Sequence, residues 1–329
     1  MGRIPHLREI ANGMRIQLVT PAPLTLNNGN KITAQRWATM LKKLGHRVRV
    51  NQNYDAESCD VLIALHARRS SDSIQRFHQR HPELPLIVVL TGTDLYSDIH
   101  RDQKAKQSLE LATRLVVLQQ LALAELPKRL HAKTRVIYQS SKPFKARSAS
   151  VSENFEVCVI GHLREEKDPL RTALAVRHLP AESRIEVTHI GSALDDHLGA
   201  KARAEASRNP RYRWVGQLSH RRTREILAQS HLTCITSKME GSSNVLSEAL
   251  ACAVPVIATQ IPGLIGTLGK NFRGYFPVGD TTRLTRLLLK AETDADFYRL
   301  LKRQCAAVAN LVQPKRELAE WRRLLQEFV

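Results

Sequence analysis

The sequence predicts an α/β protein made of two doubly wound, Rossmann-like domains that face a central cleft. Three observations support this fold class. Short β-rich runs alternate with stretches of helical spacing, which is typical of parallel strands joined by crossover helices. The alternation stops at 141–154, a serine-rich segment that contains a proline. This composition is typical of a linker, and the segments on either side of it form two similar halves. The length of 329 residues is sufficient for two domains of ordinary size.

The individual elements follow from this alternation. In the first half we expect strands at 14–20, 59–65, 86–90, 114–118 and 135–138. A helix is predicted over 31–44, because Gly45 follows its last apolar position as a C-cap signal. In the second half, strands are predicted at 155–160, 184–190, 212–215, 232–236, 255–258 and 275–277. The tail is predicted to form helices at 281–290, 296–311 and 315–328, with Pro314 between the last two.

The charge balance indicates an anionic ligand. Lysine and arginine number 50 against 31 aspartates and glutamates, which gives a formal net charge of +19. This charge attracts nucleic acid, lipid headgroups or phosphorylated small molecules. Aromatic residues make up 5% of the chain, which leaves few platforms for stacking single-stranded bases.

Hydropathy and cysteine usage indicate the compartment. No apolar run is long enough to span a bilayer, and no early stretch has signal-peptide form. The five cysteines form no CxxC pair and show no zinc spacing. We therefore expect a cytoplasmic protein without a stable membrane anchor, and we exclude the polar segment 1–13 from the fold as a disordered extension.

The most informative motif is EGSSNVLSEALAC at 240–252. A helix is expected to begin near Ser243 or Asn244, and Gly241 lets the preceding backbone approach a ligand closely. The N–H groups of the first turn suit a phosphate. Glu248 shares a helix face with Asn244 and lies one turn deeper, within reach of a ribose diol. The alternative is a capped helix whose glutamate faces water.

A second motif, GHLREEK at 161–167, follows the predicted strand FEVCVI. Arg164 and Lys167 at the end of a strand form a plausible clamp for a diphosphate. Such a clamp could replace a metal ion by neutralising a departing nucleotide. The alternative is a solvated run of charges.

Two further loops provide candidate ligand-binding positions at the ends of predicted strands. TLNNGNK at 25–31 places Gly29 and Asn30 in a tight turn between the first strand and the first helix, although a plain turn is the alternative. WVGQL at 214–218 ends a strand, and we expect Trp214 to belong to the core.

The first half carries its own polar strand ends. His66, Arg68 and Arg69 follow the run CDVLIAL, and Thr91 and Thr93 follow LIVVL. Because arginine gives forked donors, this set suits a small oxyanion. The alternative is the start of a helix with surface arginines. The end of a later strand adds two more candidates, Gln139 and Ser140.

Glu240 and Glu248 have seven residues between them, and the string ALACAVPVIAT follows the second. Together they resemble the signature of the retaining GT-B glycosyltransferases of family four. The resemblance implies a UDP-sugar donor, with Glu248 on the ribose and Glu240 near the sugar. In this family an arginine usually follows the glycine of the second motif. His162 occupies that position here, Lys167 matches the family's lysine, and Arg164 could compensate. The donor-binding residues that the resemblance implies are Gly29, Asn30, His162, Arg164, Lys167, Gln217, Leu218, Glu240, Gly241, Ser242, Ser243, Asn244, Val245 and Glu248.

The resemblance also predicts the domain boundaries. In related GT-B proteins the last helix crosses back to pack on the first domain. Its apolar positions here recur at steps of three and four residues, at Leu318, Trp321, Leu325 and Phe328. We therefore expect an acceptor domain at 14–147 plus 312–329 and a UDP-sugar domain at 148–311.

The strings TLNNGNKITAQRWA, LIALHARRS and LTGTDLY resemble one branch, the selenosugar synthases of selenoneine biosynthesis, over nearly the whole chain from Met14. This implies that selenophosphate is joined to the anomeric carbon of a UDP-sugar, UDP-GlcNAc or UDP-glucose. The sequence contains no carboxylate metal motif, and we expect no metal or other cofactor. The implied acceptor residues are Arg68, Arg69, Thr91, Thr93, Gln139 and Ser140, and the implied catalytic residues are His66, Glu240 and Lys167.

Two alternatives stay open at this point. The same fold could act on a hydroxyl acceptor of a lipid or glycan, which predicts an exposed basic amphipathic helix. A nucleic-acid-binding protein is a more remote alternative and predicts a strong dependence of binding on salt. We expect no nucleic-acid partner, and the sequence leaves the oligomeric state open.

Overall fold

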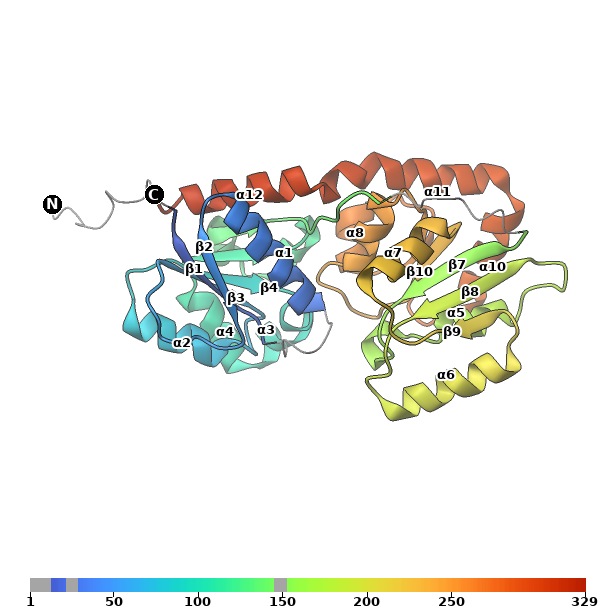
Figure 1. The fold of residues 1–329 in the computed structure, drawn as a ribbon, viewed down its shortest axis with the longest axis horizontal. Helices are drawn as coiled ribbons and strands as arrows, with labels where there is room; N and C mark the ends of the chain where they lie inside the picture. The colour runs from blue at the N-terminus through green and yellow to red at the C-terminus, as the bar shows by residue number, and fades with distance from the viewer. Residues whose placement is uncertain (1–12, 22–28, 145–152) are drawn as a thin grey trace. The chain divides into compact units, whose positions relative to one another are not determined.

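The computed structural model describes residues 13–21, 29–144 and 153–329 (Figure 1). The chain divides into two compact units, Met1–Gln139 with Pro314–Val329 (unit 1) and Ser140–Gln313 (unit 2). Nearly all of the expected extension at 1–13 and most of the loop at 25–31 lie outside the described residues. The expected α/β class is confirmed, because each unit contains a six-stranded parallel sheet with helices.

Unit 1 has the strand order β2-β1-β3-β4-β5-β6, with every neighbouring pair parallel. The strands are β1 Arg15–Val19, β2 Arg47–Asn51, β3 Val61–Leu65, β4 Leu86–Leu90, β5 Arg114–Val117 and β6 Thr134–Val136. Strands β3 and β4 are buried along their whole length, as expected for a parallel sheet covered on both faces. Crossover connections of this kind bring the carboxyl ends of the strands to one edge, where ligands bind in open α/β sheets.

Helices cover both faces of this sheet. The longer ones are α1 Gly29–Lys43, α2 Ser71–Arg80, α4 Gln103–Leu111 and α12 Pro314–Gln326. Shorter helical segments are η2 Asp94–Asp98, α3 Ile99–Arg101, η3 Gln120–Glu125 and η4 Lys128–Lys133. One core cluster joins α1 and α12 to the sheet, and a second joins α2 and α4 to its opposite face.

Unit 2 has the order β12-β11-β10-β7-β8-β9, again with parallel pairs. Its strands are β7 Phe155–Ile160, β8 Ile185–Ile190, β9 Tyr212–Trp214, β10 Leu232–Ile235, β11 Val256–Thr259 and β12 Tyr275–Phe276. Its helices are α5 Arg171–Val176, α6 Asp196–Arg208, α7 His220–Gln229, α8 Asn244–Ala251, α9 Pro262–Leu268, α10 Thr281–Thr293 and α11 Ala295–Val308. The 3-10 turns η5 Glu165–Lys167 and η6 Ala309–Val312 complete the unit.

The predicted packing of the last helix on the first half is confirmed. Trp321 of α12 is fully buried and meets Trp37 of α1 edge-on, with ring centroids 4.8 Å apart. The buried Glu317 carboxylate accepts a hydrogen bond from Trp37 Nε1 at 2.6 Å and pairs with Arg36 at 3.2 Å. A buried carboxylate is tolerated when it is paired in this way, so these contacts fix α12 in register on α1.

The expected domain boundary at 147 and 148 is corrected to Gln139 and Ser140. The start of the expected linker, at 141–144, belongs to unit 2. Arg224 of α7, which is 4% exposed, binds this segment. Its guanidinium hydrogen-bonds Ser141 Oγ, donates to the Lys142 carbonyl at 2.8 Å and lies over the Phe144 ring. The return boundary lies between Gln313 and Pro314, where the expected one was at 311 and 312.

Strand β2 is absent from the predicted set. Its sequence RVRVN alternates arginine with valine at the edge of the sheet, and only Val48 is buried. A short edge strand buries little apolar surface, so the sequence pattern that marked β3 and β4 is missing there.

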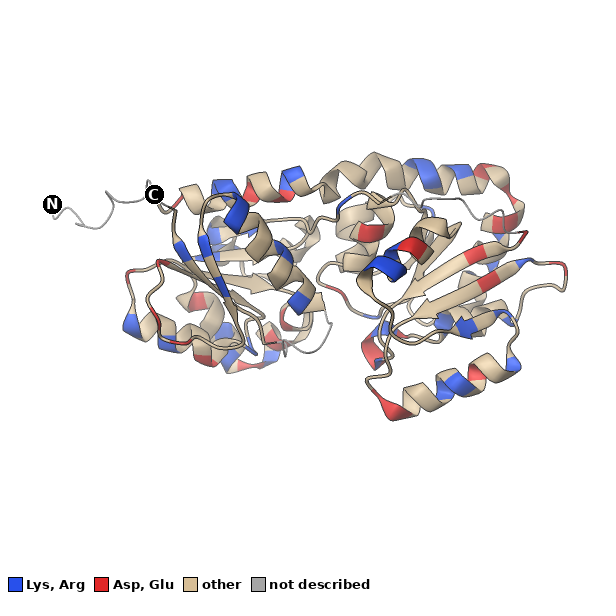
Figure 2. Ribbon diagram, in the orientation of Figure 1, with Lys and Arg blue, Asp and Glu red and all other residues tan. Residues whose placement is uncertain are grey.

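Lysine and arginine are interspersed with aspartate and glutamate on the elements of both units (Figure 2). The net charge is therefore spread over many helices and strands. None of the helices described in these ranges combines the length and apolarity needed to cross a membrane.

Candidate functional site

The first candidate site lies in unit 2, where β10 runs into α8. The side chain of Ser243 caps α8 by accepting a hydrogen bond from the Leu246 amide at 3.3 Å. The first turn of a helix directs backbone amides outwards along its axis, and this geometry suits an anion. Gly241 is buried just before this turn, while Ser242 is half-buried. The helix start predicted from the sequence is the observed one.

The structure brings two sequence motifs together in this site. The Glu240 carboxylate accepts hydrogen bonds from Lys167 Nζ and, at 2.7 Å, from Ser237 Oγ. Glu240 is 11% exposed and Lys167 is 29% exposed. The backbone at Gly263 passes close to the backbone at Glu240. Only glycine permits this approach, because a Cβ at position 263 would lie 1.8 Å from the Glu240 carbonyl oxygen. A partly buried ion pair therefore stands beside the first turn of α8.

A small pocket of about 20 Å³ opens at this ion pair. It is lined by Gly161, Lys167, Ser237, Glu240, Ser243 and Val245, among others. Among the residues that the structure describes, a Cβ on Gly161 would meet no atom within 4 Å, so the backbone there is open. A larger cavity of about 460 Å³ lies between α5 and α6, but its lining is mostly apolar and holds none of the motif residues. The smaller pocket carries the candidate chemistry.

His189, which the sequence did not single out, supports the floor of this pocket. Burial lowers the pKa of His189 to about 4, so the ring is neutral at physiological pH. Its Nε2 lies 3.0 Å from the Gly161 carbonyl oxygen, which can only accept, so Nε2 carries the hydrogen. Its Nδ1 accepts from the Tyr212 hydroxyl at 2.8 Å. This chain of hydrogen bonds fixes the backbone at Gly161.

Of the predicted clamp residues Arg164 and Lys167, one lies at the pocket and the other does not. Lys167 lines the pocket, whereas Arg164 is 39% exposed, pairs with Glu166 at 3.4 Å and does not line it. His162 Nδ1 accepts a hydrogen bond from the Ser192 amide at 3.0 Å, which places the hydrogen of a neutral ring on Nε2. Of the two predicted clamp residues, Lys167 is the one that lines the pocket beside the first turn of α8.

Glu248 lies one turn along α8, as predicted, and is 12% exposed. Its Oε1 lies 3.3 Å from Nε2 of His220, the first residue of α7. Gln217, in the loop before α7, is exposed and contacts the Ser192 hydroxyl, and Leu218 packs partly against the core. Trp214 also packs on the core, and its Nε1 donates to the Gly191 carbonyl at 2.8 Å. The expectation that Trp214 is a core residue is confirmed.

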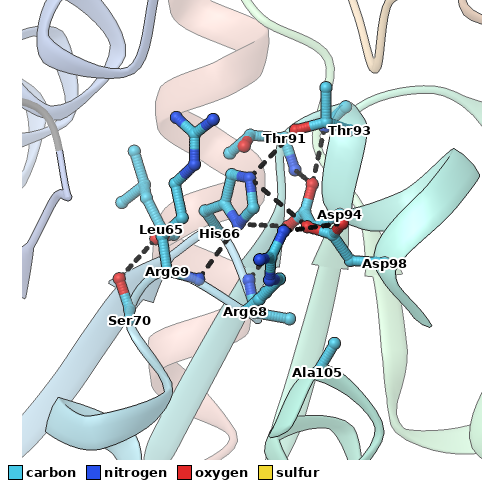
Figure 3. A network of polar contacts seen from close by, with 12 residues as sticks. Leu65, His66, Arg68, Arg69, Ser70, Thr91, Thr93, Asp94, Asp98 and Ala105 are labelled. Atoms are coloured by element: carbon cyan, nitrogen blue, oxygen red, sulfur yellow. Dashed lines mark hydrogen bonds and ion pairs between the residues drawn. The ribbon is translucent and has the colours of Figure 1, made fainter. Parts of the chain in front are cut away.

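The second candidate site lies in unit 1, at the ends of β3 and β4 (Figure 3). Its centre is Asp94, which is fully buried at the start of the π-helical turn η2. One carboxylate oxygen accepts from the amides of Thr91 and Gly92 at 2.9 and 2.8 Å, and the other accepts from the Ala67 amide at 3.0 Å. Asp94 thereby ties the two strand ends together, and π-turns of this kind are frequent at functional sites.

His66 is held tightly within this network. It is 2% exposed and adopts a left-handed backbone conformation with φ of 73°. Its Nδ1 accepts from the Arg69 amide at 3.3 Å, and its Nε2 lies 3.0 Å from Thr93 Oγ1. Because Nδ1 accepts, Nε2 carries the hydrogen of a neutral ring and donates to Thr93. Both ring nitrogens of His66, the predicted catalytic residue, are therefore engaged in hydrogen bonds.

The two predicted arginines differ. Arg68 pairs with Asp98 at 3.5 Å and with Asp102 at 3.3 Å. Arg69 is exposed, and its side chain makes no hydrogen bond or ion pair within the part of the chain that the structure describes. In Figure 3 the Arg69 side chain extends away from Asp98, whereas Arg68 lies towards it. Of the pair, Arg69 is the cation left available to an anion.

The remaining predicted residues lie elsewhere or are covered. Gln139 is buried, and its Nε2 donates to Thr33 Oγ1 of α1 at 2.7 Å. Ser140 is also buried and belongs to unit 2. Gly29 and Asn30 form the first turn of α1 rather than a loop, while the preceding residues 25–28 lie outside the described part of the chain. Within the described residues, no group of three or more His, Cys, Asp or Glu side chains could hold a metal ion.

Sequence reasoning missed Asp98, Asp102, Ser237 and His220 as partners of the candidate residues. The string TGTD, with a carboxylate three residues after Thr91, is a local signal for the loop that Asp94 organises. No comparable signal pointed to His220, because it lies 28 residues before Glu248 in the sequence and on a different helix.

Comparison with known proteins identifies the family of the chain. Residues 140–306 match the family described as glycosyl transferases group 1. The N-acetyl-alpha-D-glucosaminyl L-malate synthase of Bacillus anthracis is 36% identical over 76 residues, which are 23% of this chain and 20% of that protein. A glycosyltransferase 1 domain-containing protein of Xenopus tropicalis is 24% identical over 272 residues, or 74% of this chain and 78% of that protein.

Solved structures share the fold at low sequence identity. HepE from Anabaena, solved in complex with UDP and glucose, has a TM-score of 0.76 and 16% identity over 95% of this chain and 100% of its own. Sucrose-phosphate synthase from Thermosynechococcus elongatus has a TM-score of 0.77 and 15% identity over 95% and 98%. With its two parallel α/β units and a family match over half of its length, the chain belongs to the glycosyl transferases of group 1.

Proposed function

We propose that this protein is a selenosugar synthase that transfers the sugar of UDP-GlcNAc or UDP-glucose to the selenium of selenophosphate. The donor half of the proposal is carried by one observation: the Lys167–Glu240 ion pair stands in a pocket beside the capped first turn of α8. The acceptor half rests on Arg69 beside the buried His66–Asp94 network and on the resemblance of the surrounding strings to selenosugar synthases.

The donor would bind with its diphosphate at the first turn of α8. Backbone amides there supply donors without side-chain entropy cost, and Lys167 supplies positive charge. Glu248, one turn further along, would accept hydrogen bonds from the two ribose hydroxyls. Glu240 would then face the sugar, where its carboxylate can bind hydroxyls or stabilise positive charge that develops at the ring. HepE, a relative in fold, was solved with UDP and glucose, which supports this class of donor.

The acceptor would bind through its phosphate oxygens. The Arg69 guanidinium provides a planar fork of donors that matches such an oxyanion. The Arg69 backbone is anchored by His66, which is itself held through Thr93. Arg68 contributes less, because Asp98 and Asp102 already neutralise it.

The chemistry then needs no strong base. Selenium attacks the anomeric carbon, the carbon–selenium bond forms, and the bond from that carbon to the UDP oxygen breaks. Water then cleaves the selenium–phosphorus bond, which releases phosphate and leaves the 1-selenosugar for selenoneine biosynthesis. Because the selenium nucleophile is already anionic, the engaged nitrogens of His66 are no obstacle.

We also propose that Lys167, rather than a metal ion, compensates the charge of the leaving UDP. Lys167 would have to exchange part of its contact with Glu240 for the diphosphate, while Arg164 would have to leave Glu166 to assist. The five cysteines are free thiols, four of them buried, which supports a reducing cytoplasmic setting. No nucleic acid takes part in this reaction.

The test is the release of UDP from UDP-GlcNAc and UDP-glucose in the presence of selenophosphate. We expect release that depends on selenophosphate and is not supported by phosphate. Release that requires a hydroxyl acceptor instead would refute the acceptor assignment while retaining the donor site. If the protein binds neither UDP-sugar, both the donor site and the acceptor assignment are refuted.

A further inference from the structure

The Glu248 carboxylate has one polar side-chain partner within the described residues, the imidazole of His220. Nε2 of that ring lies 3.3 Å from Glu248 Oε1. A carboxylate can only accept, so the ring nitrogen must carry the hydrogen and donate it. Glu248 is 12% exposed, whereas His220 is 68% exposed. A largely covered acidic group is therefore held from the solvent side by a single donor.

The other charged groups on α7 are directed elsewhere. Arg221 and Arg222 pair with Glu225 at 3.0 and 3.2 Å. Arg224 hydrogen-bonds the chain at Ser141 and Lys142 and the sulfur of Cys252, the residue that follows α8. Of the charged or titratable residues of α7, His220 is thus the one that reaches Glu248.

His220 lies at the junction of a loop and helix α7. It follows Ser219, whose side chain caps α7, and it comes directly after the loop that contains Gln217 and Leu218. Its ring therefore links this loop to the helix that carries Glu248. One hydrogen bond to Oε1 leaves Oε2, and the second lone pair of Oε1, open to two hydroxyl donors.

We propose that His220 is a positioning residue that fixes the Glu248 carboxylate for recognition of the ribose diol of the donor nucleotide. The proposal rests on the donor site proposed above. His220 acts through Glu248 and need not touch the nucleotide itself. Its loss would allow the carboxylate to rotate, and the cost of re-ordering it would fall on nucleotide binding.

Calorimetry with UDP tests this role. We expect His220→Leu to weaken UDP binding about three- to tenfold, the range of a single hydrogen bond to a partly covered group. His220→Gln retains a donor near the position of Nε2 and should recover most of the affinity. Arg221→Leu, a change at the adjacent exposed residue that pairs with Glu225, is the matched control and should leave UDP affinity unchanged. In turnover, KM for the UDP-sugar should rise while kcat is kept.

The same titration in a Glu248→Ala background separates positioning from direct contact. If His220 acts through Glu248, His220→Leu should have no further effect there. An equal loss of affinity in both backgrounds would show that His220 binds the nucleotide directly. An unchanged affinity in the parent background would show that His220 neither positions Glu248 nor contacts the nucleotide. Each of these results would overturn the proposal. If the parent protein does not bind UDP, the donor site itself is refuted. Unchanged thermal melting of the His220 variants confirms that they fold.

Discussion

Replacement of Arg69 by alanine is the sharpest test of the acceptor site, because Arg68 beside it serves as an internal comparison. Arg69 makes no side-chain ion pair within the described ranges, so its full charge is available to a phosphate. Hydrogen bonds to charged groups contribute about 1.5–3 kcal/mol, which corresponds to a rise of roughly 10- to 150-fold in KM for selenophosphate. Arg68 is already neutralised by Asp98 and Asp102, and its loss should cost far less.

The assay is steady-state release of UDP at saturating UDP-sugar with selenophosphate varied. Arg69→Lys retains the charge without the planar fork and should recover only part of the affinity. UDP affinity should stay close to that of the parent in all three variants, because Lys167, Glu240 and Glu248 of the proposed donor site lie in unit 2. Equal losses for Arg68→Ala and Arg69→Ala would contradict the reasoning from ion pairs. Parent-like kinetics for both would make the two arginines surface features.

Three further outcomes are expected. Glu248→Ala should weaken UDP binding by about 1–3 kcal/mol in calorimetry, and unchanged affinity would remove Glu248 from the site. Turnover should survive EDTA, since Lys167 is proposed to balance the charge of UDP; loss in chelator and recovery with Mg²⁺ would contradict this. In unit 1, hydrogen bonds from Arg135 and Arg114 hold the pKa of Glu327 at about 2, below its unfolded value near 4.3. This contribution is present above pH 5 and is lost as the pH falls through about 2. Glu327→Gln should therefore cost about 1–2 kcal/mol in urea unfolding at pH 7 and little at pH 2, and an equal cost at both would refute the linkage.

The sequence predicted those elements that bury many apolar residues. Strand β4, Leu86–Leu90, was predicted at its observed bounds, and α8 begins where the cap signal at Ser243 placed it. Strand β2 was missed because an arginine-rich edge strand lacks the apolar run that marks a central strand. The boundary after Gln139 was misplaced because Arg224, 84 residues away from Ser140 along the chain, binds the start of the expected linker.

The candidate site was predictable to the level of motifs but not of partners. Spacing alone placed Asn244 and Glu248 on one face of α8. The pairing of Lys167 with Glu240 and of His220 with Glu248 depends on tertiary packing between segments far apart in sequence. For the same reason, the neighbouring Arg68 and Arg69 could not be distinguished until the structure placed Asp98 and Asp102 beside one of them.

The most direct test of the central claim is the mass of the product formed when the protein is incubated with selenophosphate and a UDP-sugar. The account predicts a sugar that carries selenium on its anomeric carbon, with the isotope pattern of one selenium atom, together with equimolar UDP and phosphate. A product that lacks selenium, such as a glycoside of a hydroxyl acceptor formed while selenophosphate remains unconsumed, would contradict it.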